Sequence, residues 1–160
     1  MTGRLLLALA VTAPAGPPAV VAVAPAVVTL GAGESGEVEV VARIDEGFRI
    51  QANPASEAFL VPARLELPGD ERVHVGAPVY PPGRAYRLRG ADDDLSVYEG
   101  TLVIRVPLEA RSVAGDASPG ETVLDGRLHY QACNELVCLR PSSAAVQVRV
   151  ILRPSRPANE

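Results

Sequence analysis

Residues 36–44 read GEVEVVARI, and the alternation of apolar and polar side chains in this stretch predicts a half-buried β-strand. In an extended chain Val38, Val40, Ala42 and Ile44 fall on one face, while two glutamates and an arginine fall on the other. One face of this strand is therefore expected in the core and the other in solvent.

The same alternation recurs along the chain, and no segment shows a convincing apolar period of 3.6 residues. The alternation is clear in 101–108 (TLVIRVPL), 122–132 (TVLDGRLHYQA) and 144–152 (AAVQVRVIL). Weaker strand candidates are 20–30, 48–52 and 59–67. Turn-rich segments separate these stretches, and 15 prolines and 14 glycines are spread along the chain. We therefore predict an all-β chain of seven or eight short strands, arranged as an immunoglobulin-like antiparallel β-sandwich.

The length of 160 residues suits one domain, which we assign to residues 16–152. Residues 1–15 have the layout of a secretory signal peptide or, alternatively, form a buried first strand. Residues 153–160 are rich in proline and are expected to be a flexible tail or a linker. The net charge is −4 and no basic run is present, so nucleic acid is not an expected partner.

The longest connection expected from the pattern spans residues 76–95 and contains Tyr80 and Tyr86. A loop of this length is usually functional or mobile. We consider it either a surface connection or a lid over a site.

Both cysteines, Cys133 and Cys138, lie in the stretch YQACNELVCLRP at 130–141. One interpretation is a structural disulfide, because most paired cysteines in exported domains are structural. A second is a metal site with His129 and His74, but zinc sites usually show two tight ligand pairs and this chain has one. No metal is therefore expected.

The third interpretation is a redox-active dithiol, in which one thiolate exchanges with a partner and the other resolves the mixed disulfide. Arg140 follows Cys138 by two residues and favours a thiolate there, whereas Glu135 follows Cys133 and opposes one. This asymmetry favours Cys138 as the exchanging sulfur.

The cysteine stretch resembles a signature of the N-terminal periplasmic domain of the thiol:disulfide interchange protein DsbD, with Tyr130 and Gln131 preceding the first cysteine. Other stretches match the family in order: 48–67, 79–88 and 95–108. The resemblance covers about residues 27–152. It departs from the family in the four residues between the cysteines, where some members have five.

The resemblance implies an immunoglobulin-like fold in which Cys133 and Cys138 are the redox pair. Cys138 would form the mixed disulfide with partners, and Cys133 would resolve it. Val79 and Tyr80 would take the place of the family's cap loop over the pair, although Val79 stands where the family has a phenylalanine.

The same resemblance implies protein-disulfide reductase activity without a cofactor, in the periplasm or another exported location. Thioredoxin-like redox domains and oxidised envelope proteins would be the partners. The chain would be either a fragment of a longer protein with a membrane domain or a stand-alone relative. The alternative from another functional class is a non-catalytic immunoglobulin-like binding or spacer module with a structural disulfide.

Overall fold

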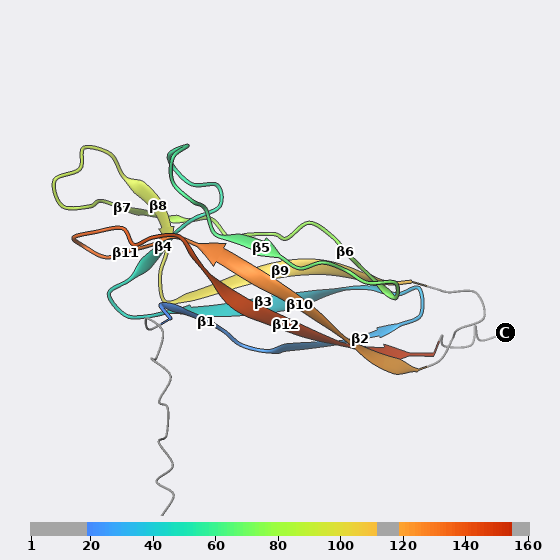
Figure 1. The fold of residues 1–160 in the computed structure, drawn as a ribbon. Helices are drawn as coiled ribbons and strands as arrows, with labels where there is room; N and C mark the ends of the chain where they lie inside the picture. Colours follow the sequence, from blue (N-terminus) through green and yellow to red (C-terminus); the bar gives the residue numbers. More distant parts are fainter. Residues whose placement is uncertain (1–18, 112–118, 155–160) are drawn as a thin grey trace, which may run out of the picture.

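The computed structural model describes residues 19–111 and 119–154, which form twelve strands and no helix (Figure 1). This described part accordingly holds no helix long and apolar enough to cross a membrane. The expectation for residues 1–15 lies outside the described residues. Of the expected tail, Arg153 is the last residue of a strand, Pro154 follows it, and the rest is not described.

The strands form three four-stranded sheets. The first has the order β1 (Val21–Val23), β3 (Ser35–Ile44), β9 (Thr101–Ala110) and β6 (Val73–Val75). The second has the order β2 (Ala26–Gly31), β12 (Ser142–Arg153), β10 (Gly120–Tyr130) and β5 (Arg64–Glu66). The third has the order β11 (Ala132–Cys133), β4 (Arg49–Gln51), β8 (Leu95–Tyr98) and β7 (Arg84–Tyr86).

The first two sheets pack face to face around the apolar residues that the alternation placed on inner faces. Val40, Ile104, Leu128 and Val148 have no exposed surface, and the polar residues between them on each strand point outward. The predicted immunoglobulin-like β-sandwich is confirmed. One pairing departs from the antiparallel expectation, since β2 runs parallel to β12.

The chain has more strands than the seven or eight expected because two candidate stretches each contain parts of two strands, and because β6, β7 and β8 lie outside the candidate stretches. Residues 20–30 form two strands, β1 in the first sheet and β2 in the second, with Pro25 at the crossing. Proline cannot donate a ladder hydrogen bond, which favours a change of partner at this point. In residues 59–67 only β5 is a strand, and it begins after Pro62.

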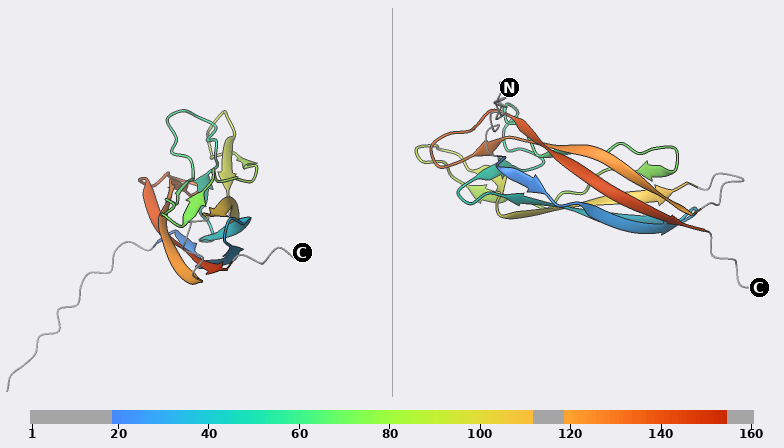
Figure 2. Two further views of the ribbon diagram at one scale, coloured as in Figure 1. Left: turned by 90° about the vertical axis from the view of Figure 1, so that its right-hand side faces the viewer. Right: turned by 60° about the horizontal axis from the view of Figure 1, so that its bottom comes forward.

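The third sheet lies at one end of the elongated sandwich (Figure 2). It is built by continuation of the long strands: β4 follows β3, β8 leads into β9, and β11 follows β10. Gly100, with φ of 68°, makes the turn between β8 and β9, in a conformation that favours glycine. The region 76–95, expected to be a loop, contains β7 and forms a hairpin with β8. Strands from both sheets of the sandwich therefore converge on this end.

Candidate functional site

Cys133 and Cys138 are joined by a disulfide across a short hairpin at the end of the sandwich. The S–S distance is 2.06 Å and the two Cα atoms are 3.9 Å apart. The residues outside the pair are held by a hydrogen bond from Leu139 N to Ala132 O of 2.7 Å. The two cysteines thus face each other as an antiparallel bridge.

Asn134 builds the turn that brings the cysteines together. Its backbone N–H donates to Val137 O at 2.9 Å. Its side-chain Oδ1 accepts from the N–H groups of Leu136 at 2.8 Å and Val137 at 2.9 Å. An asparagine side chain that caps backbone donors in this way is a common turn device.

The two sulfur-bearing residues differ in access. Cys133 belongs to β11 and is 1% exposed, whereas Cys138 is half-buried at the edge of the hairpin. Cys138 is therefore accessible from solvent, whereas Cys133 is not.

Strand β4 lies directly against Cys133 and supplies two neighbours that the sequence analysis did not assign to the site. Arg49 is the cross-strand partner of Cys133, and Gln51 Nε2 donates to Cys133 Sγ at 3.4 Å. Alternation in FRIQA places Arg49 and Gln51 on one face, but nothing in the sequence indicates that this face meets a cysteine. The pairing of β4 with β11 decides it.

The side chain of Arg49 contacts groups other than the cysteine pair. Its Nε lies 3.2 Å from Glu99 Oε2 and forms an ion pair with it. This Nε makes no hydrogen bond. Its guanidinium also stacks 3.8 Å above the ring of Tyr86. Arg49 thereby connects β4 with the β7–β8 hairpin.

The signature residues Tyr130 and Gln131 have different positions. Tyr130 is buried at the end of β10 as part of the sandwich core. Gln131 lies at the hairpin base, where its Oε1 accepts from Val61 N at 3.2 Å and its Nε2 donates to Leu139 O at 3.3 Å. Gln131 therefore ties the loop of residues 52–63 to the cysteine hairpin.

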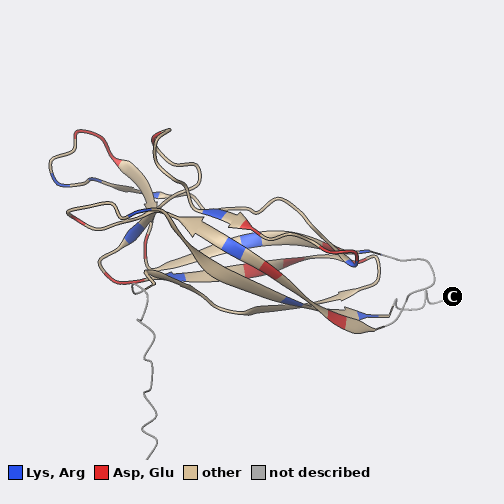
Figure 3. Ribbon diagram, viewed as in Figure 1, with Lys and Arg blue, Asp and Glu red and all other residues tan. Residues whose placement is uncertain are grey.

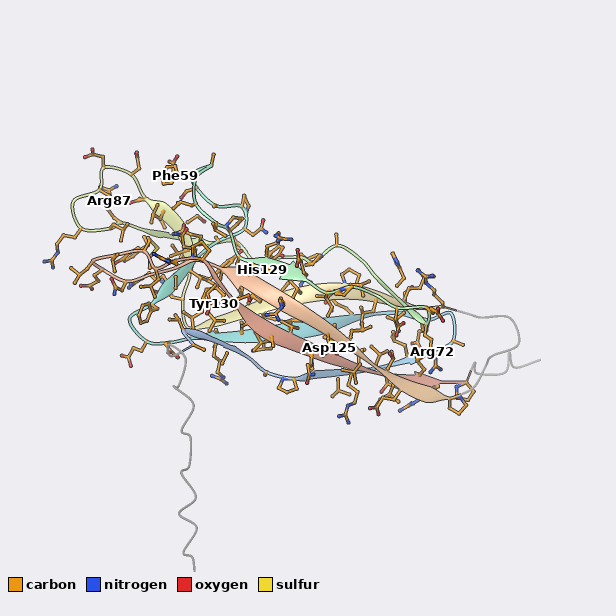
Figure 4. The ribbon with its side chains drawn as sticks, in the orientation of Figure 1. Phe59, Arg72, Arg87, Asp125, His129 and Tyr130 are labelled. Carbon is orange, nitrogen blue, oxygen red and sulfur yellow. A yellow bond between two sulfur atoms is a disulfide. The ribbon has the colours of Figure 1, made fainter. Side chains whose placement is uncertain are left out.

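A pocket of about 620 Å³ opens beside Cys138 between two loops. Its lining is mostly apolar, with three carboxylates among its residues: Glu57, Phe59, Leu60, Leu88, Ala91, Asp92, Asp93, Leu95, Gln131 and Cys138. Figure 3 shows acidic stretches on both loops at this end. Phe59 is 81% exposed on one of them (Figure 4).

The connection of residues 76–95 meets the cysteine hairpin through its later part. Leu88, residues 91–93 and Leu95 line the pocket with Cys138, and residues 86–91 line a second pocket with Glu135. Neither Val79 nor Tyr80 lines either pocket.

Val79 and Tyr80 instead contact residues of the sandwich. Val79 exchanges backbone hydrogen bonds with Arg105 of β9, at 2.7 and 3.0 Å. The Tyr80 hydroxyl accepts from Leu65 N at 2.8 Å, and its side chain packs against the core. The structure does not bring these two residues together with Cys138 in the pocket, so their role as a cap stays a prediction.

Tyr98 fixes the bases of both loops. Its hydroxyl donates to Pro81 O at 2.8 Å and accepts from Asn53 N at 3.2 Å. Burial raises the pKa of Tyr98, so the phenol stays neutral and keeps its proton for the bond to Pro81. The loops around the pocket therefore start from a common anchor.

Arg140 and Glu135, the charges weighed in the sequence analysis, are both exposed. Neither forms an ion pair within the described part of the chain. Their influence on the two thiols stays a prediction. The charged residue that stands opposite Cys133 in the ladder is Arg49.

The two histidines of the metal hypothesis lie in different sheets. His74 is in β6, and His129 is in β10, where its Nε2 is 2.9 Å from Glu66 Oε2. The hydrogen bond with His129 lowers the pKa of Glu66, with a further contribution from Arg64. Among residues 19–111 and 119–154, no group of three or more potential ligands could hold a metal.

Comparison with known families gives a match over residues 18–149 to the N-terminal family of the thiol:disulfide interchange protein DsbD. The chain belongs to this family. The DsbD N-terminal match spans all of β1 to β11 and most of β12, including the cysteine hairpin. No curated protein sequence matches the chain.

The solved structures that are similar to the chain include the following two. The DsbD N-terminal domain of Neisseria meningitidis, in its reduced form, has 20% identity and a TM-score of 0.44, covering 78% of this chain and 86% of that one. The N-terminal periplasmic domain of ScsB from Proteus mirabilis has 17% identity and a TM-score of 0.48, covering 81% of this chain and 46% of that one.

Proposed function

We propose that this chain is a thiol–disulfide exchange domain that passes reducing equivalents between protein partners through Cys133 and Cys138. The observation that carries the proposal is the unequal access to a bonded cysteine pair: Cys138 lies at the rim of an apolar pocket, and Cys133 is buried behind it. Membership of the DsbD N-terminal family supports the same chemistry.

The reaction needs only the two sulfurs and a partner disulfide. The Cys138 thiolate attacks one partner sulfur, a bond forms between them, and the second partner sulfur leaves as a thiolate. The Cys133 thiolate then attacks Cys138 Sγ, the Cys133–Cys138 bond closes, and the first partner sulfur leaves. Two electrons and two protons pass to the partner, and no cofactor takes part.

The surface around Cys138 supports exchange with proteins. Phe59 is exposed on the loop of residues 52–63. The cysteine hairpin exposes Leu136, which is 86% accessible, together with Val137 and Leu139. Exposed apolar residues gathered at one place mark interaction sites. Thioredoxin-like redox domains and oxidised envelope proteins are the partners we propose, in an exported, periplasmic location where disulfides persist.

Trapping of mixed disulfides tests this division of labour. The probe is a thioredoxin whose second cysteine is serine and whose first carries thionitrobenzoate as a mixed disulfide. Reduced Cys133→Ser should displace thionitrobenzoate through Cys138 and accumulate a covalent complex on a non-reducing gel. Cys138→Ser should form little complex, because Cys133 is buried.

Equal trapping by both variants would contradict the asymmetry. The alternative, a binding or spacer module with a structural disulfide, predicts no complex from either variant. It also predicts a reduction potential below about −300 mV, where structural disulfides lie.

A further inference from the structure

Gln51 is the one buried polar residue in the described part of the chain, with 0% exposure. Its backbone N–H donates to Gln131 O at 3.2 Å, and its carbonyl accepts from Ala63 N at 3.0 Å. The residue is therefore held between the base of the cysteine hairpin and the end of the loop of residues 52–63.

The side chain of Gln51 has only one partner among the described residues, the sulfur of Cys133. Its Nε2 lies 3.4 Å from Cys133 Sγ, and its Oε1 has no hydrogen-bond partner. A disulfide sulfur carries no hydrogen, so only the N–H end of the amide can bond to it. A glutamine buried to support the fold would use both ends, because buried polar groups are almost always paired.

We propose that Gln51 is a further catalytic residue, which stabilises the thiolate that forms on Cys133 when the disulfide opens. This inference rests on the proposed function. An external thiolate attacks Cys138 Sγ and forms a new S–S bond, the Cys133–Cys138 bond breaks, and its electron pair stays on Cys133 Sγ. The Gln51 N–H then donates to an anion instead of a neutral sulfur.

Because Cys133 is buried, the Gln51 N–H should strongly affect the stability of a thiolate on its sulfur. Water has little access to Cys133, and burial without a donor disfavours a thiolate. A hydrogen bond to an ionised acceptor is roughly twice as strong as one to a neutral acceptor. A leaving thiol with a lower pKa also departs faster.

The charged residues near the cysteine pair contact other groups or are exposed to solvent, so we expect the amide of Gln51 to stabilise the thiolate. Arg49 faces Cys133 across the ladder but is engaged by Glu99 and by the ring of Tyr86. Glu135 and Arg140, on either side of Cys138 in the sequence, are exposed to solvent.

Replacement of the amide by an apolar side chain of similar length, Gln51→Met, tests the proposal. Two quantities are measured: the pKa of the Cys133 thiol, followed by the ¹³Cβ shift in a reduced Cys138→Ser background, and the rate at which glutathione reduces the disulfide. We expect the thiol pKa to rise by about one unit and the rate to fall roughly threefold. The melting temperature should be unchanged or higher, because an unpaired buried acceptor is removed.

Gln147→Met is the matched control, since Gln147 is exposed on β12 and bonds to Asp125 Oδ1 at 2.9 Å. It should leave both quantities unchanged. A folded Gln51→Met protein with the thiol pKa and reduction rate of the parent would overturn the proposal.

A second measurement covers the case in which Gln51→Met does not fold. In the reduced Cys138→Ser protein with Gln51 intact, the side-chain amide ¹⁵N signal of Gln51 should titrate with the pKa of Cys133. An amide signal that stays constant through that titration would overturn the proposal. Glutathione needs no docking surface, so an effect of Gln51 would stand even if trapping of thioredoxin failed and the proposed function were wrong.

Discussion

Asp70 bonds to the backbone of Arg72, which lies at the end of the sandwich opposite the cysteine hairpin (Figure 4). Its Oδ1 accepts from the N–H groups of Arg72 at 2.8 Å and Val73 at 2.7 Å, and its Oδ2 accepts from Thr122 Oγ1 at 2.6 Å. Partial burial raises the pKa of Asp70, but these hydrogen bonds outweigh it and hold the pKa below the ordinary value of 3.8. The carboxylate thus joins the start of β6 to β10.

The depressed pKa of Asp70 predicts how stability depends on pH. The ionised form stabilises the fold fully above pH 3.8, and this stabilisation is lost as pH falls through the lower folded pKa. Asp70→Asn should lower the free energy of unfolding by about 1 kcal/mol at neutral pH. Urea unfolding at a series of pH values should show this difference shrinking below about pH 4. A difference that stays constant down to about pH 2 would contradict the assignment.

At the scale of elements, the hairpin of residues 132–139 and the two loops beside it form one surface. Gln131 ties the hairpin to one loop, and the pocket beside Cys138 joins it to the other. This surface combines exposed apolar side chains with the carboxylates of Glu57, Asp92 and Asp93. We therefore expect a partner with an apolar segment next to its cysteine and basic residues around it.

The chain offers a matched pair of variants to test this surface. Val137 is 52% exposed at the hairpin tip, and Val27 is 61% exposed on β2 in the second sheet. Val137→Ser should slow exchange with a protein disulfide roughly threefold, the effect of about 0.7 kcal/mol of lost apolar contact. Its exchange with glutathione should be unchanged. Val27→Ser should alter neither rate, and a loss of the same size in both variants would argue against docking at the hairpin.

At the scale of the whole molecule, the sandwich contains the core and one end of it carries the disulfide. Val148 is fully buried in β12, opposite Leu124 of β10 and Ala26 of β2. It is six residues along the strand from Ser142, where the ladder reaches the hairpin end, a separation of about 20 Å.

This separation predicts that core packing and redox chemistry can be changed independently. Val148→Ala should lower the free energy of unfolding by about 2 kcal/mol, because it removes two buried methyl groups and leaves a cavity. The reduction potential of the disulfide, measured against glutathione in the folded state, should stay within about 10 mV of the parent value. A larger shift would show that the core and the hairpin are coupled.

The sequence by itself determined the sandwich and its buried faces. Alternation in 36–44, 101–108, 122–132 and 144–152 was sufficient, because a strand with one apolar face can be buried in only one orientation. The cysteine stretch likewise indicated both sulfurs and, through the family resemblance, the family that was found.

Only the tertiary structure decided what surrounds the sulfurs. Gln51 and Arg49 are far from Cys133 in sequence and reach it because β4 pairs with β11. Tyr80 is expected at the cap by its order along the chain, and this stays a prediction; its hydroxyl bonds to Leu65 N, and later residues of that connection line one side of the pocket at Cys138. Alternation encodes which face of a strand is apolar, whereas the neighbour across a ladder or a loop depends on register between distant segments, which local patterns do not encode.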